Sequence, residues 1–368
     1  MLDLAKWLDG NYRVPGERTG IRDQESGIRD QESRGSGIGK GGRFSVPRPM
    51  KPRHRFGALI IVAAGVTLLA TTEPVRFDGA RAYEHIRQVV AFGPRPAGSA
   101  ALDSTRRYIK DRLADVGIQA AEQRFEADTP IGRIRMANLI GRIPGPVPDT
   151  LIFAGHYDTK LFRDFRFVGA NDAGSSTAFL IELGRVLKAR RNRLTIELLF
   201  LDGEEATGDW IGDDHTYGSR HYVEAARKGG TLRQVRALIL VDMIGDRDLK
   251  IRREEASTKW LTDLIWASAR RLKLNGVFVD ETMRIEDDHV PFLQGGVPAV
   301  DIIDFDNIPW WHTAGDTLDK VSARSMQTVG DVLVDALPRI EDRLVGTTKG
   351  TKQGTTRAAK QGITKTTK

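Results

Sequence analysis

The 368-residue sequence contains no cysteine. This absence excludes both a disulfide framework and a thiolate metal site, so any metal must be bound by His, Asp or Glu side chains. Aromatic residues are scarce, at 7% of the chain, and in its middle part they are not interleaved with a basic face. Because such a face is typical of nucleic-acid-binding proteins, we do not expect a nucleic acid as a partner.

The positive charge of the chain is concentrated at its two ends. Residues 1–56 hold 12 Lys or Arg against 7 Asp or Glu, and residues 347–368 hold 6 Lys or Arg and no acid. With a total of +7, the ends carry +5 and +6, which leaves the middle at −4. This mildly acidic middle is long enough to bury a large core. We expect one catalytic domain over residues 77–346 and a disordered basic tail over 347–368.

The N-terminal stretch has no apolar face to bury. It contains a perfect duplication, with GIRDQES at 20–26 and again at 27–33. We therefore expect residues 1–49 to be disordered, or not to be translated, since Met50 offers a second start.

An apolar run of about 15 residues follows Met50 and its basic neighbours, which is short for a membrane span of ~20 residues. The run covers residues 56–70, and a basic stretch before such a run is typical of a secretory signal. We expect residues 50–72 to be a signal peptide or an uncleaved membrane anchor. The protein would then be exported: periplasmic, secreted, or anchored to a membrane through residues 56–70. A short buried helix is the alternative.

Apolar strand-like runs alternate with helical segments through the middle of the chain. Strands are predicted at 136–143, 150–154, 194–201, 237–243 and 298–303, and helices at 79–90, 100–116, 174–189, 217–229, 257–274 and 322–345. This alternation predicts a single three-layer α/β domain, with a mainly parallel mixed sheet covered by helices on both faces. Ligands in such sheets bind outside the carboxyl ends of the strands.

Acidic and histidine side chains follow these strands, where a site is expected. Each alone is a weak signal, because a lone Asp after a glycine caps a helix about as often as it binds a ligand, and a Glu-Glu pair is usually solvated. Their coincidence at the ends of several strands predicts a metal site. The residues are His156, Asp158, Asp172, Glu204, Glu205, Asp242 and His312.

Two neighbouring carboxylates suggest a division of roles. Side chains adjacent in sequence point in different directions, so Glu205 can bind zinc while Glu204 serves as general acid and base. Asp242 interrupts an apolar strand, where an unpaired carboxylate would be costly. We therefore expect Asp242 to have a partner, although a solvated surface acid is the alternative.

The order of these residues, from about Phe92 to Val345, resembles the zinc aminopeptidase family. A closer resemblance is to the glutaminyl cyclases of the animal type, in which Asp287 stands where aminopeptidases usually have serine. The matching stretches are HYDTK at 156–160, DGEEA at 202–206, YGSRH at 217–221, DDHVPFL at 287–293 and WHT at 311–313.

The resemblance implies a zinc-exopeptidase-like fold and the cyclisation of N-terminal glutamine of peptides to pyroglutamate, with release of ammonia. It implies one zinc ion bound by three side chains, with Glu204 as the proton shuttle. Asp242 and Asp287 would be hydrogen-bonded to each other as further catalytic residues. The implied zinc ligands are Asp172, Glu205 and His312, with His156 beside the metal, and Trp210, Trp311 and Ile285 lining the substrate pocket.

Two other functions are open at this point. In a two-zinc aminopeptidase, Asp172 would bridge the ions, and His156 and Asp242 would complete the second metal site. A catalytically silent binding domain is the third reading. We rank it low because no ligand and no general base is missing. Either tryptophan could instead be an ordinary core residue.

Overall fold

The computed structural model describes residues 75–305 and 308–361, with side chains described up to residue 346. The first buried hydrophobic residue is Phe77. The segments 1–49 and 50–72, for which the sequence predicted disorder and a signal peptide or anchor, lie outside the described residues. Among the helices of the described part, none combines the length and apolar character of a membrane span.

A six-stranded sheet forms the centre of the domain, in the order β1-β2-β4-β3-β5-β8. Strands β4, β3, β5 and β8 are parallel, whereas β1, β2 and β4 pair in antiparallel fashion. The strands are β1 (Ala120–Thr129), β2 (Gly132–Ile143), β3 (Thr150–His156), β4 (Thr195–Leu201), β5 (Val235–Asp242) and β8 (Ala299–Ile303). The mainly parallel, mixed sheet predicted from the sequence is confirmed.

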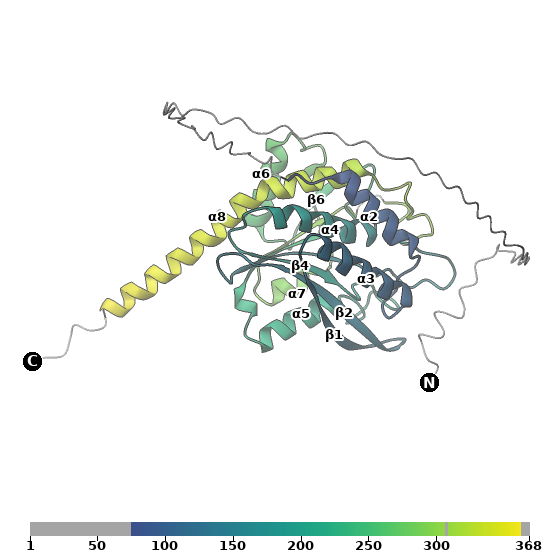
Figure 1. The fold of residues 1–368 in the computed structure, drawn as a ribbon, viewed down its shortest axis with the longest axis horizontal. Helices are drawn as coiled ribbons and strands as arrows, with labels where there is room; N and C mark the ends of the chain where they lie inside the picture. Colours follow the sequence, from purple (N-terminus) through teal and green to yellow (C-terminus); the bar gives the residue numbers. More distant parts are fainter. Residues whose placement is uncertain (1–74, 306–307, 362–368) are drawn as a thin grey trace, which may run out of the picture. The chain divides into compact units, whose positions relative to one another are not determined.

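Side chains of each buried strand point alternately to the two faces of the sheet, so both faces are apolar and helices cover both. In β3, Leu151 and Phe153 belong to the larger core, and Ile152 and Ala154 belong to the smaller one. The larger core includes α2 (Gly79–Ala91), α3 (Ala100–Asp115), α4 (Gly174–Ala189), α6 (Lys259–Arg271) and α8 (Ala323–Gln361). The smaller core includes α5 (Tyr217–Lys228) and α7 (His289–Gln294), which lie on the opposite face (Figure 1).

Several short or exposed elements were not predicted. Strand β1 reads AAEQRFEADT and is largely exposed at the sheet edge, so it has no apolar run. Strands β6 (Ile251–Glu254) and β7 (Phe278–Met283) form a separate two-stranded parallel sheet. Half of the residues of β7 are exposed, so a buried-strand pattern is absent there as well.

Helix α8 extends beyond the end at residue 345 that the sequence predicted. In the structure it continues to Gln361, through part of the segment that was expected to be a disordered tail. The residues after Val345 include Lys, Arg, Ala and Gln and no proline. The segment 346–361 also contains three glycines and five threonines, which are poor helix formers, so local propensity does not explain why the helix continues.

Candidate active site

A cleft of about 480 Å³ opens at the carboxyl ends of the parallel strands. His156 is the last residue of β3, Asp242 is the last residue of β5, and Glu204 follows β4 closely. The cleft is lined by every predicted site residue except His156 and Asp158, which are buried. The lining residues include Asp172, Glu204, Glu205, Trp210, Asp242, Ile285, Asp287, Trp311 and His312.

Three of these side chains converge as the predicted zinc ligands. His312 Nε2 lies 3.1 Å from Glu205 Oε1 and 3.3 Å from Asp172 Oδ2. One ligand atom from each side chain lies within 4.8 Å of the others, and Glu205 Oε2 is buried without a hydrogen-bond partner. Two ligands at about 2.0–2.2 Å from one zinc ion are about 3–4 Å apart, so this donor set fits zinc.

The turn that carries Asp172 is held in place by residues for which the sequence predicted no role. The carboxylate of Asp316 accepts the backbone N–H groups of Asn171, at 2.8 Å, and Asp172, at 3.1 Å. The fully buried guanidinium of Arg95 donates to the carbonyl of Gly169 at 3.1 Å. Gly169 has a φ of +49°, and any side chain there would collide with the carbonyl oxygen of Asp172.

Asp158 positions the two adjacent glutamates. Its two carboxylate oxygens accept the backbone N–H groups of Glu204, at 3.2 Å, and Glu205, at 3.3 Å. This carboxylate is completely buried at the end of β3, so it orients the segment after β4 without lining the cleft. These two bonds fix the backbone from which the side chains of Glu204 and Glu205 project.

A second group of possible ligands shares Asp172 with the first. His156 Nε2 lies 3.0 Å from Asp242 Oδ1 and 3.2 Å from Asp172 Oδ1. The ligand atoms of these three side chains also lie within 4.8 Å of one another. Asp172 thus presents one oxygen to each group, which is the arrangement that a bridging carboxylate would need.

Burial makes the cleft a place where negative charge is costly. It raises the pKa of Glu204 well above its usual value, and the charges of Glu205 and Asp287 add to this, whereas His156 opposes it. Burial would lower the pKa of the His312 imidazole, but Glu205 raises it, and with Asp172 the result is about 10. A bound cation would offset this crowding of carboxylates.

The hydrogen bond predicted between Asp242 and Asp287 is not formed. Asp242 Oδ1 is bonded to His156 and to the backbone N–H of Met243, and Asp287 Oδ1 accepts the N–H of Asp288. Two carboxylates cannot bond to each other unless one carries a proton. The two acids still influence each other. Burial raises the pKa of Asp242 to about 7, and the charge of Asp287 adds to this rise, whereas His156 opposes it. Neither acid is a solvated surface group.

A buried polar network that the sequence did not predict lies behind Asp287. His289 Nε2 is 3.2 Å from Glu254 Oε2, and His289 Nδ1 is 3.6 Å from Asp301 Oδ2. Burial, with the charges of Asp287 and Asp242, raises the pKa of Asp301 well above its usual value. Asp301 interrupts the apolar strand β8, whereas Asp242 is the last residue of β5. An acid inside an apolar run is a signal that could have revealed Asp301.

Aromatic side chains form the walls of the cleft. Trp210 stacks on His215, with ring centroids 4.2 Å apart, and Trp311 stacks on His312 at 4.0 Å. Trp210 is 36% exposed and Trp311 is 38% exposed, so neither is a core residue. Ile285 also lines the cleft. All three predicted pocket residues are therefore brought together.

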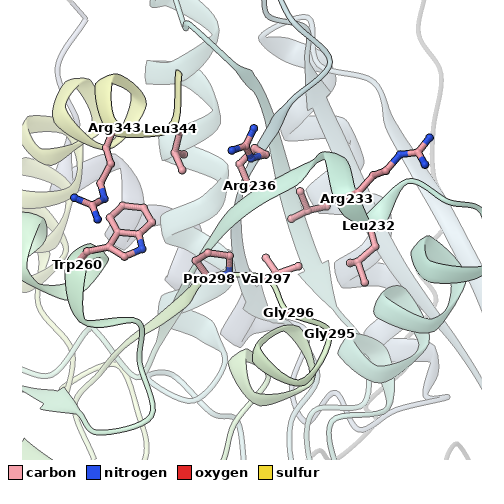
Figure 2. Close-up of a pocket in the computed structure, with 11 residues that line it drawn as sticks. Leu232, Arg233, Arg236, Trp260, Gly295, Gly296, Val297, Pro298, Arg343 and Leu344 are labelled. Carbon is pink, nitrogen blue, oxygen red and sulfur yellow. The ribbon is translucent and has the colours of Figure 1, made fainter. Parts of the chain in front are cut away.

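A second cavity, of about 650 Å³, lies near the start of β5 and the loop before β8 (Figure 2). Its lining includes Arg233, Arg236 and Arg343, and the guanidinium of Arg343 lies over the ring of Trp260. No carboxylate or imidazole belongs to this lining. The cavity therefore has no group able to bind a metal or transfer a proton near neutral pH.

The chain resembles known proteins over most of its described part. The profile of peptidase family M28 matches residues 138–337. The glutaminyl-peptide cyclotransferase of Drosophila melanogaster is 27% identical over 336 residues, which cover 82% of this chain and 94% of that protein. A glutaminyl-peptide cyclotransferase-like protein of Mus musculus is 31% identical over 268 residues, covering 65% of this chain and 70% of that protein.

A solved structure agrees with these sequence relatives. The crystal structure of an Acidobacteriales bacterium glutaminyl cyclase superposes with a TM-score of 0.70 and 40% sequence identity. The superposition covers 74% of this chain and 98% of that chain.

Proposed function

Since the chain belongs to peptidase family M28, and the relatives described above are glutaminyl-peptide cyclotransferases and glutaminyl cyclases, we propose that it is a zinc-dependent glutaminyl-peptide cyclotransferase. It converts the N-terminal glutamine of peptides to pyroglutamate and releases ammonia. We propose that one zinc ion is bound, by Asp172, Glu205 and His312. The observation that carries the proposal is the convergence of these ligands beside Glu204, in a cleft walled by Trp210 and Trp311.

The residues of the cleft suit an intramolecular attack of an amine on an amide. When bound, zinc would polarise the γ-amide carbonyl and stabilise negative charge on its oxygen. Glu204 takes the proton from the attacking α-amine and returns it to the departing nitrogen. The α-amine nitrogen forms the ring bond to the carbon of the γ-amide. The bond from that carbon to the amide nitrogen breaks, so ammonia leaves.

Positioning supplies much of the rate enhancement, because nucleophile and electrophile belong to the same residue. Holding them in an attack geometry can contribute several kcal/mol of the ~8 or more that catalysis usually requires. The faces of Trp210 and Trp311 restrict the glutamine side chain and exclude water from it. Asp242 and Asp287 take part by controlling the charge next to Glu204.

The second candidate is a two-zinc aminopeptidase, and one observation favours it. His156, Asp242 and the shared Asp172 form a complete second group of ligands. In this reading Glu204 would activate a water molecule in place of the substrate amine. The hydrogen bond from His156 to Asp242, together with the neighbouring charge of Asp287, supports a single zinc instead.

A paired assay distinguishes the two activities. The expected result is ammonia release from a Gln-initiated dipeptide and no cleavage of a leucine arylamide. Glu204→Gln should abolish ammonia release while zinc remains bound, and the matched exposed variant Glu126→Gln should retain both. Cleavage of the arylamide without ammonia release would overturn the proposal in favour of the aminopeptidase.

A further inference from the structure

The mouth of the cleft carries acidic side chains that the proposed chemistry does not use. Asp209 and Glu286 both line the cleft, and both are exposed to solvent. Among the ion pairs of the described residues, neither carboxylate takes part in one. Lys160 is the only lysine or arginine in the lining, and its ammonium donates to the carbonyls of Ala206, at 2.8 Å, and Gly208, at 3.0 Å.

Both acids lie on the side of the cleft formed by Trp210. Asp209 precedes Trp210 in the chain, and Trp210 stacks on His215 with an angle of 9° between the rings. Glu286 follows Ile285, which also lines the cleft, and its charge partly raises the pKa of His215 against the lowering effect of burial. The two carboxylates therefore form one negatively charged rim along this wall.

The two carboxylates outnumber the one ammonium of Lys160, so the rim keeps a net negative charge, and other charged groups nearby do not neutralise it. Arg220 forms an ion pair with Asp213 at 3.2 Å and donates to the backbone carbonyl of His215 at 2.8 Å. Arg284 is exposed but does not belong to the cleft lining. The rim also has an apolar part, because Trp210, which lines the cleft, is 36% exposed.

On the basis of the proposed cyclase function, we infer that this rim selects peptides with Lys or Arg directly after the N-terminal glutamine. The glutamine occupies the cleft floor beside Glu204, so the next residue leaves through the mouth. A long basic side chain fits the rim in two ways: its aliphatic stem packs on Trp210, and its cation meets Asp209 and Glu286. An acidic side chain at the same position is repelled.

The test compares kcat/KM for Gln-Lys, Gln-norleucine and Gln-Glu dipeptide amides at low ionic strength. Exposed charge pairs each contribute little, so we expect Gln-Lys to exceed Gln-Glu by about threefold to tenfold, with norleucine between them. In 0.5 M NaCl the ratio should fall towards one, because salt screens exposed charges. Equal values for the three peptides at low salt would overturn the inference.

Charge-removing variants locate the effect. D209N and E286Q should each lower the Gln-Lys to Gln-Glu ratio about twofold to threefold, and the double variant should lower it further. The matched control D111N removes one exposed carboxylate on helix α3, outside the cleft lining, and should leave the ratio unchanged. An unchanged ratio of kcat/KM for Gln-Lys to that for Gln-Glu in the double variant would contradict the role of the rim.

A binding experiment separates this inference from the proposed function. Calorimetric titration of the Glu204→Gln variant with the same dipeptide amides needs no turnover. Tighter binding of Gln-Lys than of Gln-Glu supports the rim even if no peptide is cyclised, in which case the cyclase proposal alone fails. Equal binding of both peptides, with ammonia still released by the unaltered enzyme, means that the rim inference alone fails.

Discussion

The carboxylate of Asp172 reaches the metal site because other residues hold the turn that carries it. Asp316 is the clearest example, since it accepts the N–H groups of Asn171 and Asp172 and belongs to none of the candidate groups of metal ligands among the described residues. In Asp316→Asn, an amide N–H₂ replaces one acceptor and faces a backbone donor. Because such supporting residues typically contribute 10-fold to 100-fold to metal affinity, we expect a loss of about that size. Competition with a chromogenic chelator measures it.

The control for this variant is Asp319→Asn, which changes an exposed carboxylate three residues away. It should leave zinc affinity unaltered. If Asp316→Asn binds zinc as tightly as the unaltered protein, the turn does not depend on this carboxylate.

The raised pKa of Asp242 predicts how the stability of the metal-free protein depends on pH. Folding raises this pKa from its ordinary value of 3.8 to about 7, chiefly through burial. The folded state therefore holds a proton that the unfolded state has lost between these values. The stability from this group is complete below pH 3.8 and is lost as the pH rises through about 7.

Asp242→Asn removes the carboxyl group that takes up this proton on folding. We expect the free energy of unfolding of the metal-free variant to fall less steeply between pH 4.5 and 7, by up to roughly 1.4 kcal/mol per pH unit. Urea denaturation at several pH values, with a chelator present, measures the slope. An unchanged slope would show that Asp242 is ionised in the folded protein throughout this range.

The candidate ligands could be predicted at the residue scale, but the residues that support them could not. Asp172, Glu204, Glu205, Asp242 and His312 all lie in or after predicted strands or in a glycine-rich turn, so their positions in sequence carry information. Arg95 and Asp316 act through contacts with backbone groups far away in the chain. No local pattern encodes such a contact, and only the fold reveals it.

At the scale of elements, strand β3 is the centre on which the site is built. It pairs with β4 on one side and β5 on the other, and its residue Phe153 is 1% exposed in the larger core. Phe153→Ala should lower the free energy of unfolding by about 3–5 kcal/mol, because it leaves a cavity. Urea denaturation of the zinc-loaded protein measures this. Phe153→Leu, which retains most of the volume, should lose less, and equal losses would argue against tight packing around β3.

Buried elements were predicted well and edge elements poorly, for a physical reason. Strands β3, β4 and β5 are buried on both faces, so they read as continuous apolar runs. Strands β1 and β7 are only partly buried, so their sequences lack the apolar run that would predict a strand. Their strand conformation depends on a neighbouring strand that the local sequence does not specify.

At the scale of the whole molecule, the topology brings together side chains that are distant in sequence. Glu205 and His312 are separated by 107 positions, yet their ligand atoms lie 3.1 Å apart. The parallel strands end at the same edge of the sheet, so each loop after a strand contributes to one cleft. The two functions considered for this chain differ in how many metal ions that cleft binds: one ion beside Asp242 and Asp287, or two ions with Asp242 as a ligand of the second.

The number of zinc ions per chain tests this account most directly. Mass spectrometry of the metal content, on protein purified without chelators and passed through gel filtration, gives the ratio. We predict a value near one for the unaltered protein and near zero for His312→Ala, because His312 belongs only to the first group of ligands. A value near two in the unaltered protein would contradict the account and indicate the two-zinc aminopeptidase.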